Sequence, residues 1–246
     1  MSDAVNQIPS GAVDGRWRQW LRVLLHGAVP GRCLVCREPG TAGRDLCPAC
    51  TAVLPWMPHA CTRCAQPLAT HDPICGACLR RSPPLDAVIA AFDYGFPVDR
   101  LLPRFKFHRD LAAGALLGAC LAQATSHALR PAALVPVPLH RARLRERGYD
   151  QALELARVLA RRHALPLRTD LLCRVRATAP QSRLDAKARR RNVRHAFAIQ
   201  RLADAPAHVV LIDDVMTTGA TLHAAAHALR RAGVRRVDAW VCARVR

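Results

Sequence analysis

The feature that most constrains the fold is the stretch over residues 209–221, which reads VVLIDDVMTTGAT. Residues 209–212 form a short apolar run bounded by charge, which predicts a fully buried central strand of a parallel sheet. Two carboxylates, Asp213 and Asp214, come next at the expected carboxyl end of that strand, followed by a small turn rich in hydroxyl groups. A helix is predicted directly after the turn, over residues 222–231. Backbone N–H groups of the turn and of the helix N-terminus converge in such a unit, which predicts an anion site.

The two acids need an explanation, because adjacent carboxylates beside a phosphate site repel each other unless a polyhydroxyl ligand or a cation uses them. An acidic turn before a surface helix is the plainer alternative. The order of residues resembles the phosphoribosyl-pyrophosphate signature of type I phosphoribosyltransferases: an apolar strand, two acids, a variable pair and TTGAT. The resemblance implies that the acids bind the ribose 2′- and 3′-hydroxyls and that the loop binds the 5′-phosphate. The candidate residues for this ligand are Asp213, Asp214, Val215, Met216, Thr217, Thr218, Gly219, Ala220 and Thr221.

The N-terminal third contains a tandem cysteine repeat. A Cys-x2-Cys, x10, Cys-x2-Cys pattern begins at Cys33, and each of its cysteines recurs 28 residues later. Each knuckle supplies two thiolates, and two knuckles complete a tetrahedral sulfur site that suits zinc. Four protein ligands leave no open position, so both zinc ions would be structural. The predicted sets are Cys33, Cys36, Cys47 and Cys50, then Cys61, Cys64, Cys75 and Cys78, with interleaved sets and disulfides as the alternatives.

Positive charge is concentrated in one part of the chain. Residues 139–194 hold 16 Lys and Arg against 5 Asp and Glu, a net +11 of the total +19. The first basic segment follows an apolar run over 133–137, so it is expected at the same sheet edge as the two acids. Arginine fits phosphate oxygens, which favours pyrophosphate binding over a merely solvated charged face. The basic-loop candidates are Lys106, Arg141, Arg143, Arg145, Arg147, Arg174, Arg176, Gln181, Arg191 and Asn192.

Hydrophobic patterning predicts the remaining elements. Strands are expected over residues 86–94, 133–137 and 236–243, and helices over 15–27, 98–107, 111–129, 151–163 and 185–193. The helix over 98–107 carries Lys106 between two phenylalanines. Two readings of this lysine are open: it contacts a phosphate or a base, or it is solvated while both rings pack.

Three stretches together resemble the ComF family, including its GntX-like members: the cysteine knuckles, PLHRARLRERGYDQA joined to RATAPQSRLDAKARRRN, and VVLIDDVMTTGAT. The family pattern R-G-[FY]-[ND]-Q is matched at residues 147–151, with Asp150 where Asn is common. The resemblance implies an α/β fold of the type I phosphoribosyltransferase kind, a mostly parallel sheet flanked by helices, preceded by a double zinc ribbon. We expect a tail with a short helix over 1–29, the ribbon over 30–82 and the phosphoribosyltransferase-like domain over 83–246.

The resemblance leaves two functions open. As an enzyme, the protein would bind Mg²⁺ and phosphoribosyl pyrophosphate, or a related ribose 5-phosphate compound, and would transfer the phosphoribosyl group to an unknown acceptor. Residues 174–192 would then close over the site. As a binding protein, it would use the basic rim over 139–194 to handle single-stranded DNA and would keep the sugar-phosphate site as a sensor or scaffold.

The resemblance also indicates where the protein acts and with what. The family is associated with natural transformation, which adds other DNA-uptake proteins as expected partners. No apolar run approaches the roughly 18 residues of a membrane span, and no signal-peptide cleavage pattern is present. A cytoplasmic location is therefore expected, with the cysteines as thiols or metal ligands.

Overall fold

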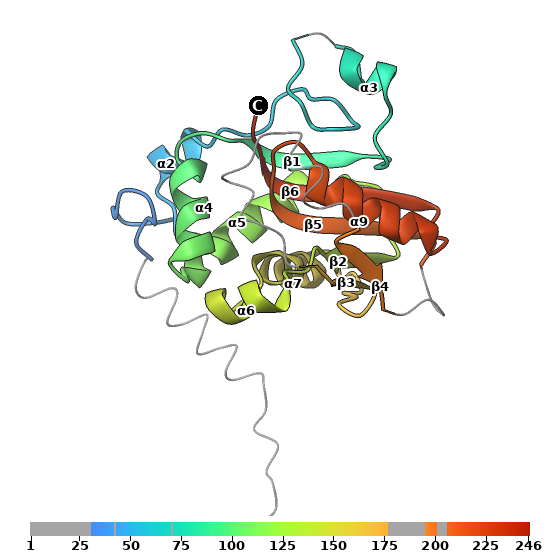
Figure 1. Cartoon of the computed structure of the whole chain (residues 1–246). Coiled ribbons are helices and arrows are strands. Elements are labelled where there is room, and N and C mark those ends of the chain that lie inside the picture. The colour runs from blue at the N-terminus through green and yellow to red at the C-terminus, as the bar shows by residue number, and fades with distance from the viewer. Residues whose placement is uncertain (1–30, 42, 70, 177–194, 201–205) are drawn as a thin grey trace, which may run out of the picture. The chain divides into compact units, whose positions relative to one another are not determined.

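The computed structural model describes residues 31–41, 43–69, 71–176, 195–200 and 206–246. The chain divides into two compact units between Pro48 and Ala49. The second unit contains the second cysteine repeat together with the main sheet (Figure 1). The helices predicted over 15–27 and 185–193 lie outside the described residues.

The two cysteine repeats share their backbone hydrogen bonds as well as their spacing. The equivalent bonds run from Cys33 N to Glu38 O at 2.8 Å and from Cys61 N to Gln66 O at 2.8 Å. The residue after each first knuckle is left-handed, with φ of 69° at Arg37 and 53° at Ala65. The second knuckle of each repeat runs into a short helix, α2 (Pro48–Ala52) or α3 (Gly76–Arg80). The sequence period is therefore a structural period.

The described residues form one four-stranded parallel sheet in the order β1-β6-β5-β2. Its strands are β1 (Val88–Asp93), β2 (Ala133–Pro136), β5 (His208–Met216) and β6 (Arg236–Arg244). Helix α9 (Ala220–Arg231) packs on one face, and α5 (Leu111–Ala124) and α7 (Gln151–His163) pack on the other (Figure 1). Helix α4 (Val98–Phe107) packs against α5. The parallel sheet flanked by helices confirms the predicted fold class.

Successive residues of β5 face opposite sides of the sheet, because side chains alternate along a strand. Val209 and Leu211 belong to the apolar cluster that includes residues of α9. Val210 and Ile212 therefore face α5 and α7, and all four side chains are completely buried. By the same alternation, Asp213 lies on the α9 face and Asp214 on the face of α5 and α7.

Strand β5 is longer than predicted and includes both acids. Strand β6 pairs with it as far as Met216↔Arg244, but the β2 register ends at Ile212↔Pro136. Val137 donates one more bond to Ile212 O at 3.0 Å, and the next residue, Pro138, has no N–H to continue. Asp213 and Asp214 therefore lie within the last part of the strand rather than after it. Along this part, β6 is the one paired strand among the described residues.

The segment predicted as a basic loop after β2 contains a helix, α6 (Arg141–Arg147). Arginine, leucine and glutamate are good helix formers, and Gly148 ends the helix with a left-handed φ of 85°. The dense charge of this segment favours a loop, but the helix propensity of its residues and the Gly148 cap produce a helix. Helices α4 and α7 have the predicted bounds.

Two further differences concern short or weakly marked elements. Helix α5 ends at Ala124 rather than at residue 129. The next residue, Thr125, is its C-cap, and the Thr125 hydroxyl donates to Leu121 O at 2.8 Å. Strands β3 (Leu172–Arg174) and β4 (Phe197–Ile199) form an antiparallel pair that was not predicted, because strands of this length carry too little pattern. Of the helices that the structure describes, none has the length and apolar character needed to span a membrane.

Candidate functional site

A shallow open hollow lies where β5 leads into α9. It is lined by Asp213, Val215, Met216, Thr217, Gly219, Ala220, Thr221 and Leu222. Helix α9 begins here with Gly219 as its N-cap, which has no side chain to cap the helix, and its first turn contains no acid. The N–H groups and the dipole of a helix start favour a bound anion. The hollow thus combines an anion site with one carboxylate.

The turn requires glycine at position 219. Its φ of 74° is left-handed, and a Cβ atom would lie 2.6 Å from Met216 Cε and 2.9 Å from His223 Nε2. Any larger residue would strain the backbone and displace both neighbours. The close approach of the chain to the hollow therefore depends on this residue.

Asp213 is the acid that lines the hollow. Burial raises its pKa to about 7, and the nearby charge of Asp214 adds to the shift. Its Oδ1 accepts a hydrogen bond from Asp214 N at 2.9 Å. Arg174, at the end of β3, interacts electrostatically with this carboxylate. Burial lowers the pKa of Arg174, and the Asp213 charge opposes that change. With a pKa of about 7, the Asp213 carboxyl can gain or lose a proton near neutral pH.

Asp214 has a different environment on the other face of the sheet. Its side chain is only 6% exposed, and its Oδ2 lies 2.9 Å from Lys106 Nζ and accepts a hydrogen bond from Gln151 Nε2 at 3.3 Å. Burial alone would raise the pKa of Asp214, but Lys106 and Gln151 outweigh it and the pKa is lowered. The pKa of Lys106 is raised in spite of burial, because Asp214 and Asp213 stabilise its charge. Lys106 and Asp214 therefore form a charged pair in which Asp214 is buried and Lys106 is 28% exposed.

The structure decides part of the question about Lys106. Phe105 is completely buried, whereas Phe107 is 65% exposed, so the expectation that both rings pack is wrong for Phe107. Lys106 is not simply solvated either, because its ammonium is paired with Asp214. The helical spacing of α4 puts these three neighbours on different sides of the helix.

The two residues that follow Tyr149 position the site from α7. Asp150 Oδ1 caps the helix by accepting from Leu153 N at 3.2 Å, and its Oδ2 accepts from Leu139 N at 2.9 Å. Aspartate and asparagine are both good caps, so Asp150 performs the structural task of the commoner Asn. Gln151 then reaches Asp214. Hydrophobic patterning gives Gln151 no role. Its position as the last residue of the R-G-Y-D-Q pattern is the sequence signal for its contact with Asp214.

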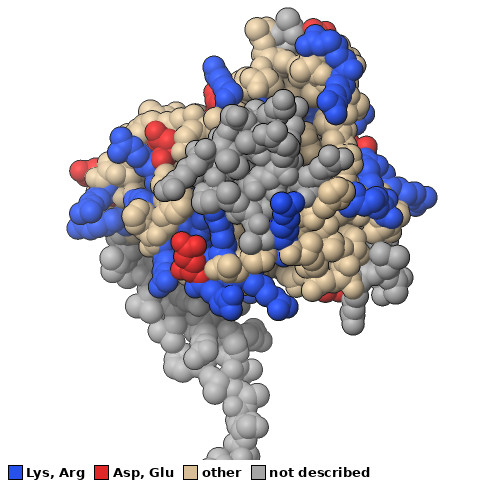
Figure 2. All heavy atoms as spheres, in the orientation of Figure 1, with Lys and Arg blue, Asp and Glu red and all other residues tan. Residues whose placement is uncertain are grey.

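The other basic candidates differ in how far they are exposed. Arg147 stacks over the Phe107 ring at 5.4 Å, and Arg143 is half-buried. Arg141, Arg145 and Arg176 are exposed, and Figure 2 shows Lys and Arg atoms gathered where α6 lies in Figure 1. Gln181, Arg191 and Asn192 lie outside the described residues.

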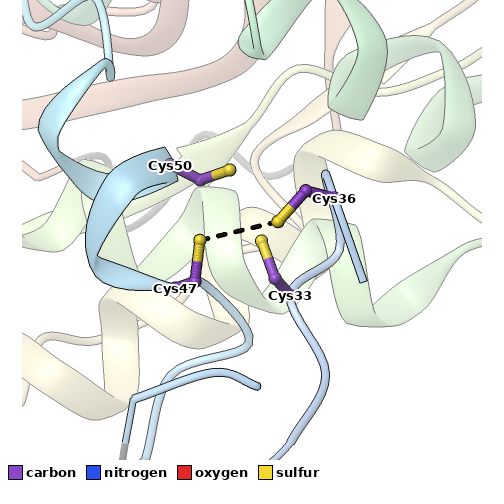
Figure 3. A group of neighbouring side chains, drawn as sticks. All are labelled: Cys33, Cys36, Cys47 and Cys50. Atoms are coloured by element: carbon purple, nitrogen blue, oxygen red, sulfur yellow. Dashed lines mark hydrogen bonds between the residues drawn. The ribbon is translucent and has the colours of Figure 1, made fainter. Parts of the chain in front are cut away.

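The eight knuckle cysteines form two clusters, in the sequential grouping that the repeat favours. Within each cluster the sulfur atoms all lie within 4.8 Å of one another, and in Figure 3 those of the first cluster point toward one another. Tetrahedral zinc with Zn–S bonds of about 2.3 Å separates its sulfurs by about 3.8 Å. The Sγ–Sγ distances are 3.5 Å for Cys36–Cys47 and 3.7 Å for Cys64–Cys75. Both clusters fit a structural zinc ion.

The first cysteine of each repeat ionises more readily than an ordinary thiol, whereas burial raises the pKa of Cys64 to about 11 and also raises the pKa of Cys78. Burial works against a thiolate at Cys33, but backbone N–H groups that include those of Cys36 and Cys47 lower its pKa to about 6. The same opposition of burial and backbone donors lowers the pKa of Cys61 to about 7. Thiolates, not thiols, are the metal-binding form.

Comparison with known proteins agrees with both parts of the structure. The double zinc ribbon domain family matches residues 24–79, and the phosphoribosyl transferase domain family matches residues 151–246. DNA utilization protein YhgH of Escherichia coli K12 is 34% identical, over 88% of this chain and 98% of that protein. Competence protein F of Haemophilus influenzae is 35% identical, over 87% of this chain and 96% of that protein.

The chain belongs to the ComF family. A more distant member, competence protein ComFC of Bacillus subtilis, is 30% identical over 71% of this chain and 73% of that protein. The predicted family, the double zinc ribbon and the phosphoribosyltransferase fold are thereby confirmed. In this ComF protein, the ribbon match includes both cysteine clusters.

We expect elemental analysis of the purified protein to find about two zinc ions per chain, one for each tetrahedral cysteine set. Cys78→Ser should reduce the content to about one, because it removes a ligand from the second set alone. Cys173→Ser changes a cysteine outside both sets and should leave the content unchanged. A folded protein without metal, or one with disulfides under reducing conditions, would contradict the assignment.

Asp213→Asn should stabilise the protein more at about pH 8 than at about pH 5.5. The folded-state pKa of about 7 lies above the ordinary 3.8, so within that window the folded state holds a proton that the unfolded state has lost. Wild-type stability therefore falls as the pH rises through the window, by up to about 1.4 kcal/mol per pH unit, and asparagine removes this loss. Urea unfolding at both pH values measures the difference. Asp170→Asn, which changes an acid paired with Arg168, is the control, and a pH-independent effect of Asp213→Asn would contradict the raised pKa.

Proposed function

We propose that this protein binds phosphoribosyl pyrophosphate together with Mg²⁺ in the hollow over residues 213–221. One observation carries the proposal: β5 and β6 extend past the end of β2, so Asp213, the turn and the start of α9 border one open space. Ligands of open α/β sheets bind at the carboxyl ends of strands, which is the position of this space.

Each part of the ligand has a chemical counterpart in the site. The N-terminus of α9 and the turn before it would bind the 5′-phosphate. Asp213 would accept hydrogen bonds from ribose hydroxyls, with Asp214 held charged behind it by Lys106. The arginines of α6 and Arg174 would neutralise the pyrophosphate, whose oxygens are also the ligands that Mg²⁺ prefers.

Transfer of the phosphoribosyl group is the reaction that such binding would serve. An acceptor nucleophile would attack the anomeric carbon, the bond to pyrophosphate would break, and pyrophosphate would leave with its electron pair. The names of the relatives, a DNA utilization protein and two competence proteins, support a role in DNA uptake or use.

Titration calorimetry with Mg²⁺ and phosphoribosyl pyrophosphate tests the proposal. We expect binding by the wild type and a loss of at least about tenfold in affinity for Asp213→Asn, because a carboxylate that accepts a hydroxyl bond contributes about 1.5–3 kcal/mol. Asp170→Asn is the matched control and should bind as the wild type does. Equal affinity of the wild type and Asp213→Asn would overturn the assignment.

The same experiment detects the proton of Asp213. Hydroxyl donors favour the ionised carboxylate, so ligand binding at about pH 7 should release protons to the buffer. The measured enthalpy should therefore change with the ionisation enthalpy of the buffer in the wild type and not in Asp213→Asn. If the binding enthalpy of the wild type does not depend on the buffer, Asp213 does not lose a proton on binding, and its proposed contact with the ligand is wrong.

Single-stranded DNA binding is a second candidate function, favoured by the exposed arginines of α6. Arginine neutralises backbone phosphates with little dependence on sequence. Arg141→Ala with Arg145→Ala should weaken binding of a labelled oligonucleotide and reduce the salt slope by about 1.4. Arg231→Ala with Arg235→Ala removes the same number of exposed charges from outside the 139–194 rim and should have little effect. If both double variants weaken binding equally, the interaction reflects net charge alone.

A further inference from the structure

The first knuckle of the second cysteine repeat is built into the sheet domain. Its three residues after Cys61 each make a contact with the domain: Thr62 O accepts from Val88 N at 2.8 Å, and Arg63 donates to Leu85 O at 3.2 Å. The carbonyl of Cys64 accepts from Arg244 Nε at 3.0 Å. The next residue, Ala65, is buried in the apolar cluster that underlies α9.

Arg244 connects this knuckle to the turn of the candidate site. It is the last residue of β6 and pairs in register with Met216. Its Nη1 donates to Met216 O at 3.2 Å and to Thr217 O, while its Nε donates to Cys64 O. One guanidinium thus holds a cysteine carbonyl on one side and two carbonyls at the start of the turn on the other.

The geometry of the guanidinium makes this connection stiff. Its donors are fixed in one plane, so a shift of the Cys64 carbonyl that carries the guanidinium with it also shifts the Nη1 bonds to Met216 O, Thr217 O and Val245 O. The knuckle in turn depends on its metal, because structural zinc supplies the free energy that orders such small cysteine sites. The position of the turn should therefore respond to the state of the second cysteine set.

We propose that Arg244 is a positioning residue that couples zinc binding at Cys61, Cys64, Cys75 and Cys78 to ligand binding at the 213–221 hollow. Zinc in this set holds the turn in its binding conformation, and a bound sugar phosphate retains the zinc by the same coupling, since linkage between two sites is reciprocal. The ligand part of this inference rests on the proposed function. The effect of zinc on the turn does not.

Hydrogen exchange of the ligand-free protein tests the effect of zinc on the turn. Loss of the second zinc in Cys78→Ser should speed exchange of the backbone amides over residues 215–221 by at least about fivefold, within the usual range of such couplings. Arg244→Met should show the fast exchange with zinc present, and Arg244→Lys, which keeps the charge but not the fork, should be intermediate. Arg246→Met, which removes a nearby arginine paired with Asp93, is the control and should exchange as the wild type does.

Zinc release to a chromogenic chelator tests the reciprocal effect. At equilibrium with the chelator, Mg²⁺ with phosphoribosyl pyrophosphate should raise the affinity for one of the two zinc ions about tenfold in the wild type and in Arg246→Met, and should not do so in Arg244→Met. Slow exchange of the turn in Cys78→Ser would overturn the coupling. Zinc-dependent exchange without any effect of phosphoribosyl pyrophosphate would keep the role of Arg244 and overturn the proposed ligand instead.

Discussion

The candidate site exists because β5 continues past the point where its neighbour β2 ends. Strands β5 and β6 stay paired to Met216 and Arg244, while β2 leaves at Pro138. A strand bordered on one side only has backbone and side chains available to a ligand on the other. This difference places one acid, a glycine turn and a helix N-terminus around the same space, and it also brings Arg244 under the turn.

The alternation of a strand then gives the two adjacent acids different environments. Asp213 borders the hollow and has a raised pKa, whereas Asp214 is locked to Lys106 and Gln151 with a lowered pKa. A charged Asp214 disfavours ionisation of Asp213, so the internal pair helps to set the proton affinity of the acid at the hollow. Pairing with Asp214 partly offsets the cost of removing the Lys106 ammonium from water.

Most of the architecture could be predicted from local patterns, and most of the contacts could not. The buried run over 209–212, the glycine turn and the cysteine spacing each have a signal that a short stretch carries by itself. The pairing of Lys106 with Asp214 joins residues far apart in sequence, and no local pattern reports it. The same holds for Arg244, an arginine among many, whose role depends on the register of β5 with β6. Helix α6 has a local signal in the helix propensity of its residues and in Gly148, although its charge pattern is also typical of a basic loop.

The linker between the two cysteine sets, residues 51–60, covers one edge of the sheet. Strand β1 is an end strand, and such strands expose unpaired N–H and C=O groups that invite other chains to add to the sheet. Here Met57 N donates to Ala91 O at 2.8 Å, Asp93 N donates to Pro55 O at 2.9 Å, and Trp56 stacks on Phe92. The linker therefore shields this edge. A truncated phosphoribosyltransferase domain that lacks the ribbon and linker would expose the β1 edge, through which two copies could pair.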